Sequence, residues 1–262
     1  MDNRSEEKFY NRSLERALHI LNTFNRQRKS LSLSQLAENL NLSRATVLRL
    51  CTTLIKYDFL AHDPETKRYS LGPRLFELGS IAYHAVPLRE AAASHLSRLH
   101  QKVGKTIFLG ILVNDQLLYI DKREDPGHAI RFTSQIGTRR PPHWGMLGPL
   151  LMAFQPDEEV RRLLEKNPLT ANTKKSIVKK DKYLRWLKEI RDKEVALDLE
   201  GTFEGVTGVA VPVRDSKGTV IAALGVAFIS AAVDPKGLKT IIKETKQTAQ
   251  MISRDMGLSP DH

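Results

Sequence analysis

The sequence predicts an α+β protein built from two domains, an N-terminal winged helix-turn-helix and a larger C-terminal domain of mixed strands and helices. Its 262 residues are enough for two ordinary domains. Near the N-terminus, two short runs with apolar residues at helical spacing flank Asn39 and Asn41. From residue 106 onwards, runs typical of strands mix with helical runs, which indicates a sheet packed against helices.

Composition narrows the class of protein. Hydrophobic residues make up 41% of the chain, enough for a core in each domain. The formal net charge of +11 favours a polyanionic partner, but residues 1–72 carry 12 Lys and Arg against 8 Asp and Glu, so the charge does not locate a binding surface. A single cysteine, Cys51, excludes an internal disulfide, and we expect it to be a small core residue. The chain shows no signal peptide and no membrane-spanning run, so we expect a cytoplasmic protein without membrane contact.

The helix-turn-helix is expected between residues 31 and 60. Two sets of apolar residues mark the inward faces of its helices: Leu33, Leu36 and Leu40 in the first, and Val47, Leu50 and Leu54 in the second. Ser32 or Ser34 can cap the first helix, and Ser43 can cap the second. Asn39 and Asn41 supply the break, because asparagine tolerates the left-handed conformation that a helix end requires.

The outward side of the second helix carries small hydroxyls and arginines: Ser43, Arg44, Thr46 and Arg49. This combination suits the major groove of DNA, where arginine can bind guanine in bidentate fashion and hydroxyls can reach bases or phosphates. We therefore interpret these residues as a candidate DNA-binding face. The alternative is a plain helical hairpin with a solvated polar face.

Further elements complete the first domain, which we place at residues 13–72 after a loose tail at 1–12. A helix is expected from Ser13, its N-cap, with an apolar stripe of Leu14, Ala17, Leu18, Leu21 and Phe24. Residues 59–62 and 68–71 flank a turn at residues 63–67, which predicts a β-hairpin or wing. Lys67 and Arg68 near its tip are candidates for phosphate or minor-groove contacts. An ordinary solvated hairpin is the alternative.

A linker helix is expected at residues 73–87, and the second domain at 88–258. In that domain we expect helices over 88–104, 143–154, 157–166, 183–193 and 235–256, with Asp157 as the cap of the third. We expect strands over 106–113, 116–124, 128–134, 195–201, 205–215 and 218–228. Residues 139–142 are interpreted as a stiff loop, and residues 166–182 as an exposed polar loop.

With these elements placed, the chain resembles the IclR family of transcriptional regulators. The resemblance rests on five motifs: SLERALHILNTF, LSLSQLAENLNLSRATVLRLCTTL, RYSLGPRLFELG, PPHWGMLGPLLMAF and GVTGVAVPVRDSKGTVIAALGV. It implies a winged helix-turn-helix, a GAF-like domain that binds a small organic effector, and a homodimer or tetramer that binds a double-stranded DNA operator without a cofactor. In this family the linker helix and the N-terminal domains contribute to pairing.

The C-terminal domain departs from the family pattern around its expected pocket. Family members often present a cysteine where this chain has Gly208, and serines where it has Gly225 and Ala227. We expect an effector site with apolar walls from Leu109, Ile111, Trp144, Met146 and Val226, oriented by His143, Asp198 and Thr207. The alternative is that Trp144 and Met146 are simply core residues. Loss of the thiol and hydroxyls should remove donors and open volume, which favours a bulkier or aromatic ligand over a small keto acid.

Two other classes of function stay open. An enzyme could use His143 with Asp198 or Glu200, or the cluster of Asp121, Glu124 and Asp125, but no nucleophile elbow, phosphate loop or metal-ligand spacing accompanies them. We expect Asp121 to Asp125 to form a solvated strand end and the chain not to be an enzyme. A ligand-independent DNA-binding protein would not need the larger second domain.

Overall fold

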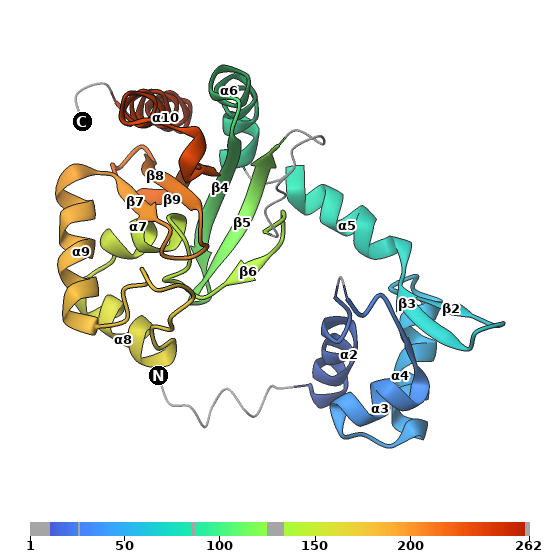
Figure 1. The fold of residues 1–262 in the computed structure, drawn as a ribbon. Coiled ribbons are helices and arrows are strands. Elements are labelled where there is room, and N and C mark those ends of the chain that lie inside the picture. The colour runs from blue at the N-terminus through green and yellow to red at the C-terminus, as the bar shows by residue number, and fades with distance from the viewer. Residues whose placement is uncertain (1–10, 26, 85–86, 125–133, 260–262) are drawn as a thin grey trace. The chain divides into compact units, whose positions relative to one another are not determined.

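The computed structural model describes residues 11–25, 27–84, 87–124 and 134–259 (Figure 1). Contacts between residues divide the chain into two compact units, residues 1–85 and 86–262. Each unit has its own hydrophobic core, so each is described by itself.

Three helices form the body of the first unit: α2 (Arg12–Asn22), α3 (Leu33–Leu40) and α4 (Arg44–Lys56). Ser32 caps α3 in a reciprocal capping box with Gln35. Asn41 adopts a left-handed conformation (φ 52°) at the end of α3, which turns the chain towards α4. Leu36, Val47 and Cys51 are fully buried between the helices. The predicted helix-turn-helix, its N-cap serines and the core position of Cys51 are thus confirmed.

Helix α2 differs from the prediction in its start and in its buried face. It begins at Arg12, inside the predicted tail, because the side chain of Asn11 and not that of Ser13 accepts the first free backbone N–H groups. Ile20 and Phe24 face the core, whereas Leu14 and Leu18 are 59% and 50% exposed. The predicted apolar stripe was therefore wrong at Leu14 and Leu18, whereas Leu21 and Phe24 do belong to the core, as predicted.

The wing is a three-stranded sheet in the order β1-β3-β2, with β1 (Ser30–Ser32), β2 (Leu60–Asp63) and β3 (Arg68–Leu71). Asp63 accepts hydrogen bonds from the backbone of Glu65 and Thr66 and so holds the hairpin turn. Strand β1 pairs antiparallel with β3 and was not predicted. Helix α5 (Pro73–His84) follows the wing.

The second unit contains a six-stranded antiparallel sheet in the order β6-β5-β4-β9-β8-β7. Its strands are β4 (Thr106–Val113), β5 (Gln116–Arg123), β6 (Arg139–Arg140), β7 (Ala196–Leu199), β8 (Val206–Arg214) and β9 (Val220–Ile229). Residues 139 and 140 pair with β5, so the first half of the stiff loop expected at 139–142 is instead a short edge strand. The strand predicted at 128–134 lies, apart from Ser134, outside the described residues.

Helices cover both faces of this sheet (Figure 1). Helices α6 (Pro87–Val103) and α10 (Pro235–Asp255) pack on one face, and the 3-10 turn η2 (Ser230–Ala232) precedes α10. On the other face lie α7 (Leu147–Ala153), α8 (Asp157–Lys166) and α9 (Lys180–Lys193). Helix α7 starts four residues later than predicted, after a turn in which Gly145 has φ +63°. The N-cap of α8 is Pro156, so Asp157 is the first helical residue and not the predicted cap.

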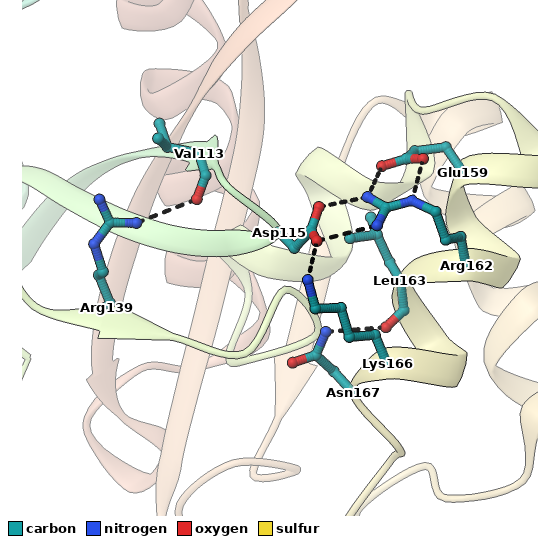
Figure 2. Close-up of polar contacts among 8 residues, drawn as sticks. All are labelled: Val113, Asp115, Arg139, Glu159, Arg162, Leu163, Lys166 and Asn167. Atoms are coloured by element: carbon teal, nitrogen blue, oxygen red, sulfur yellow. Dashed lines mark hydrogen bonds and ion pairs between the residues drawn. The ribbon is translucent and has the colours of Figure 1, made fainter. Parts of the chain in front are cut away.

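The turn between β4 and β5 is tied to α8 by a cluster of ion pairs (Figure 2). Asn114 and Asp115 both have positive φ, which is typical of a two-residue hairpin turn. The Asp115 carboxylate accepts from Arg162 and, at 2.7 Å, from Lys166. Arg162 also donates to Glu159 at 2.6 and 2.8 Å. These partners hold the pKa of Asp115 below its usual range.

Candidate DNA-binding face and ligand cavity

The exposed side of α4 begins with a hydroxyl pair. The Ser43 hydroxyl accepts from the Thr46 backbone N–H at 3.2 Å and lies 2.9 Å from the Thr46 hydroxyl. Both side chains are therefore already engaged in starting the helix. Arg44 and Arg49 are exposed, and within the described residues their guanidinium groups have no partner. The α4 face thus offers two free arginines over a capped helix N-terminus, an arrangement that can meet base edges or phosphates.

The two basic residues of the wing are placed differently from one another. Arg68 donates from Nε to the Ser30 hydroxyl at 2.9 Å and from Nη2 to the Ser30 carbonyl at 2.8 Å. Its side chain therefore ties β1 to β3. Lys67 is exposed at the tip with φ 54°, and its ammonium has no partner within the described residues. Of the predicted pair, Lys67 is thus the residue whose charge is free for a phosphate.

On the α7/α9 face of the second unit, two cavities adjoin each other. The inner one has a volume of about 40 Å³ and is lined by Phe108, Tyr119, Trp144, Met146 and Phe203, among others. The outer one has a volume of about 260 Å³ and lies beside α9 and the loop at residues 167–179. Gly145, Asp198 and Thr202 line both cavities.

The sheet register brings three predicted site residues into one row. Asp198 on β7 lies opposite Gly208 on β8, which lies opposite Ala227 on β9. All three line the inner cavity, together with Trp144 and Met146. His143 lines the outer cavity. The structure therefore brings these six predicted residues to the same region.

Four other predicted site residues lie on the wrong side of the sheet. Leu109, Ile111 and Val226 pack in the core beneath α6 and α10. Thr207 shares that face by strand alternation with Val209, and its hydroxyl lies 2.8 Å from that of Ser230. Side chains alternate between faces along a strand, so these residues cannot line a cavity with Gly208 and Ala227. Contrary to expectation, these four residues therefore do not share a cavity with the other predicted site residues.

The glycines at 208 and 225 do not open volume, contrary to expectation. A Cβ at Gly208 would lie 2.8 Å from Met146 Sδ, and a Cβ at Gly225 would lie 2.6 Å from Leu147 Cδ2 and 2.9 Å from Met146 Cε. The Met146 and Leu147 side chains thus occupy the space that a thiol or hydroxymethyl group would need. Gly225 is therefore covered, and it is not among the residues that line the inner cavity.

Burial controls the protonation of the polar groups in these cavities. Burial lowers the pKa of His143, which favours the neutral imidazole, and its buried Nδ1 has no hydrogen-bond partner within the described residues. Burial raises the pKa of Asp198, opposed by hydrogen bonds from Thr202 and from the Gly201 backbone N–H at 2.7 Å. The site therefore offers one neutral, unsatisfied polar atom and one carboxylate held by the β7–β8 loop.

Sequence reasoning missed the aromatic and loop residues of the cavities. Phe108, Tyr119 and Phe203 line the inner cavity, and Tyr183 and Trp186 line the outer one. The loop expected to be merely exposed is anchored here, since Thr173 and Ser176 donate to the carbonyls of Glu200 and Gly201 at 2.7 Å each. The aromatic residues stand out in the sequence only once strand faces are known, and no local pattern marks the loop.

The carboxylates weighed as catalytic groups have structural partners. Asp121 is fully buried and pairs with Arg123 and, at 3.3 Å, with Arg89 of α6, so the expected solvated strand end is wrong. Glu124 pairs with Lys122 at 2.7 Å, Glu200 pairs with Lys175 at 3.1 Å, and Asp125 lies outside the described residues. Among the described residues, no cluster of three or more His, Cys, Asp or Glu could hold a metal ion. No described helix is long and apolar enough to cross a membrane.

A winged helix-turn-helix with free arginines, followed by a separate α+β unit with a small-molecule cavity, defines the class of ligand-responsive DNA-binding regulators. Residues 13–64 match the model of the IclR helix-turn-helix domain, and residues 81–254 match that of the bacterial transcriptional regulator IclR C-terminal domain. The chain therefore belongs to the IclR family and is a DNA-binding transcriptional regulator with a C-terminal effector-binding domain.

Individual relatives agree with this placement. The chain is 33% identical to the HTH-type transcriptional regulator XynR of Escherichia coli over 245 residues, covering 94% of this chain and 97% of XynR. It is 30% identical to KdgR of the same organism, covering 88% of each chain. These relatives are regulators and not enzymes, as predicted.

Solved structures show the same fold. An IclR transcriptional regulator from Alicyclobacillus acidocaldarius superposes with a TM-score of 0.84 at 28% identity, covering 95% of this chain and all of that chain. An IclR homolog from Microbacterium hydrocarbonoxydans complexed with 4-hydroxybenzoate superposes with a TM-score of 0.81 at 26% identity, covering 93% and 98% of the two chains.

Proposed function

We propose that α4 is the helix that reads the operator, with Arg44 and Arg49 in the major groove and Lys67 of the wing on the phosphate backbone. The observation that carries this proposal is the pair of exposed arginines on the first turns of α4, without partners in the described residues. Ser43 and Thr46 contribute by fixing the helix start, which sets the direction in which the arginines project. Arg68 acts indirectly, because its hydrogen bonds to Ser30 hold the wing together.

We further propose that the working form is at least a dimer. Phe76 and Ile81 on α5 are 81% and 66% exposed, and Leu14 and Leu18 add exposed apolar area on α2. Apolar side chains at this density on an isolated helix are typical of a surface that a second copy covers.

We also propose that the protein acts in the cytoplasm, where its target DNA lies.

A dimer predicts how the half-sites of the operator are arranged. Two copies of α4 related by a two-fold axis should protect two half-sites centred about 34 Å apart, or a multiple of that distance. DNase footprinting on the DNA flanking the protein's own gene should therefore show a near-palindromic protected region. A single asymmetric half-site at saturation, with a monomer in sedimentation, would contradict the dimer.

For the effector, we propose a small aromatic acid bound in the adjoining cavities. Aromatic side chains line both cavities, and the neutral His143 imidazole leaves its Nδ1 free for a hydroxyl or carboxyl group. Met146 and Leu147 fill the space beside Gly208 and Gly225, where family members offer groups that suit small keto acids. The relative that holds 4-hydroxybenzoate supports the same class of ligand.

Calorimetry tests this ligand class. We expect 4-hydroxybenzoate or a related aromatic acid to bind more tightly than pyruvate or glyoxylate. Trp144→Ala should lower the affinity for the aromatic ligand. Trp144 lines the inner cavity and packs edge-on against Phe203, with 5.8 Å between the ring centroids. Tight pyruvate or glyoxylate binding that survives Trp144→Ala would refute both the ligand class and the position of the wall.

A further inference from the structure

One segment of the effector-binding unit carries a large excess of positive charge. Residues 161–188 carry ten Lys and Arg against two Asp and Glu, a net of +8 out of the +11 of the whole chain. Residues 1–72, which contain the DNA-reading helix, have a net charge of only +4, from 12 basic and 8 acidic residues. A large excess of positive charge therefore lies in a segment to which DNA reading assigns no role.

This segment comprises most of α8, the following loop and the first part of α9. Helices α8 and α9 lie side by side on the same face of the sheet (Figure 1). Two ion pairs join them, Lys180 with Glu165 at 3.8 Å and Arg191 with Asp157 at 3.3 Å. On α9, residues 182, 185 and 188 follow at intervals of three, away from the buried Tyr183, Leu187 and Ile190.

Ion pairs neutralise only part of this charge. Arg162 and Lys166 are held by Asp115 and Glu159 (Figure 2), and Lys175 is held by Glu200. Six cations on this surface are exposed and have no side-chain partner within the described residues: Arg161, Lys174, Lys179, Lys182, Arg185 and Lys188. We call these six residues the basic face. Of the two acidic residues in the segment, Glu165 is paired and Asp181 is exposed among the lysines.

We propose that the basic face binds the phosphate backbone of duplex DNA, as a second DNA contact of the effector-binding unit. Four of its six cations are lysines, which act as point charges towards phosphates and need no fixed geometry. Lysine is depleted in protein–protein interfaces, where aromatic anchors dominate, so the same chemistry disfavours an acidic protein as the partner. Contacts to phosphates carry no sequence information, so this face adds affinity for DNA without altering which operator is chosen.

The test compares two triple variants that remove the same charge from opposite faces of the sheet. Lys179→Gln, Arg185→Gln and Lys188→Gln remove half of the basic face but spare Lys182, which lines the outer cavity. The matched control is Lys236→Gln, Lys239→Gln and Lys243→Gln on α10, three exposed lysines without side-chain partners in the described part of the chain. The affinity of each variant for a labelled random-sequence duplex is measured by fluorescence anisotropy, without effector, at salt concentrations from about 50 to 200 mM.

Each cation that contacts a phosphate steepens the dependence of log affinity on log salt by roughly 0.9. We expect the basic-face variant to show a slope shallower than wild type by about one to three units, whereas the control retains the wild-type slope within about half a unit. Arg185→Lys, which keeps the charge, should behave as wild type. Equal slopes for the two triple variants, with unchanged melting temperatures, would overturn the proposal, and the reading role of Arg49 would be unaffected.

Discussion

The long, flexible side chain of Met146 packs against the sheet at Gly208 and Gly225, which have no side chains. Methionine adapts to irregular space, so it fills this hole without a fixed geometry. The sequence alone suggested that the two glycines enlarge the pocket, because it does not show which neighbour fills the space. Residue identity at 208 and 146 therefore has to be interpreted as a pair, and the pair shapes the inner cavity.

This pairing predicts non-additive stability changes. Gly208→Ala should lower the free energy of unfolding by about 1–3 kcal/mol, because its Cβ would lie 2.8 Å from Met146 Sδ. Met146→Ala should cost about 2–5 kcal/mol on its own, since the side chain is buried. In the double variant the Gly208→Ala cost should shrink by about 1 kcal/mol or more, as measured by urea unfolding. Strictly additive costs would show that the two residues do not compete for space.

The protonation states of Cys51 and His143 are likewise set by the surroundings of single residues. Burial raises the pKa of the Cys51 thiol to about 11, so this residue stays a neutral core group near neutral pH. Burial shifts the pKa of His143 in the opposite direction, downwards, and so also favours its neutral form. In both cases desolvation disfavours the charged state, which is a thiolate for Cys51 and an imidazolium for His143.

At the scale of elements, local signals located the helix-turn-helix well, whereas the predicted caps Ser13 and Asp157 lie one or two residues after the true N-caps, Asn11 and Pro156. Ser32, Asn41 and Ser43 mark the ends of α3 and the start of α4 because capping depends on residues within a single turn. The hairpin turn at Asn114 and Asp115 was predictable for the same reason. Strand β1 was not, because only pairing with β3, almost forty residues away, makes its three residues a strand.

The same limit explains why some residues expected to line the cavity lie on the other face of the sheet. Alternation along β4 and β9 separates two sets of residues, but periodicity does not say which set faces α7 and which faces α6 and α10. Leu109 and Val226 were assigned to the cavity because they are apolar, although Phe108 and Ala227 beside them line it. Arg68 was similarly taken for a phosphate contact, since its bonds to Ser30 depend on the unpredicted strand β1.

At the scale of the whole molecule, the helix-turn-helix and the cavities lie in different units. The first unit holds the helix-turn-helix with the proposed reading helix, and the second holds the cavities and most of the net charge. Ligand binding can change DNA affinity only if the ligand prefers one arrangement of the protein, since equal affinity for both arrangements shifts nothing. The family resemblance was visible from motifs in both units, whereas the packing of Met146 against Gly208 and Gly225 was not, because it depends on contacts between distant residues.

The central claim, that α4 reads the operator, is tested most directly by an operator-binding titration with Arg49→Ala beside Lys67→Ala. If Arg49 contacts a base, its loss should cost about 1–3 kcal/mol on the operator and much less on unrelated duplexes. Lys67→Ala should instead lower the affinity for all duplexes alike. It should also make the slope of log affinity against log salt shallower by roughly 0.9. Operator affinity and sequence preference that are both unchanged in Arg49→Ala would contradict the assignment of α4 as the reading helix.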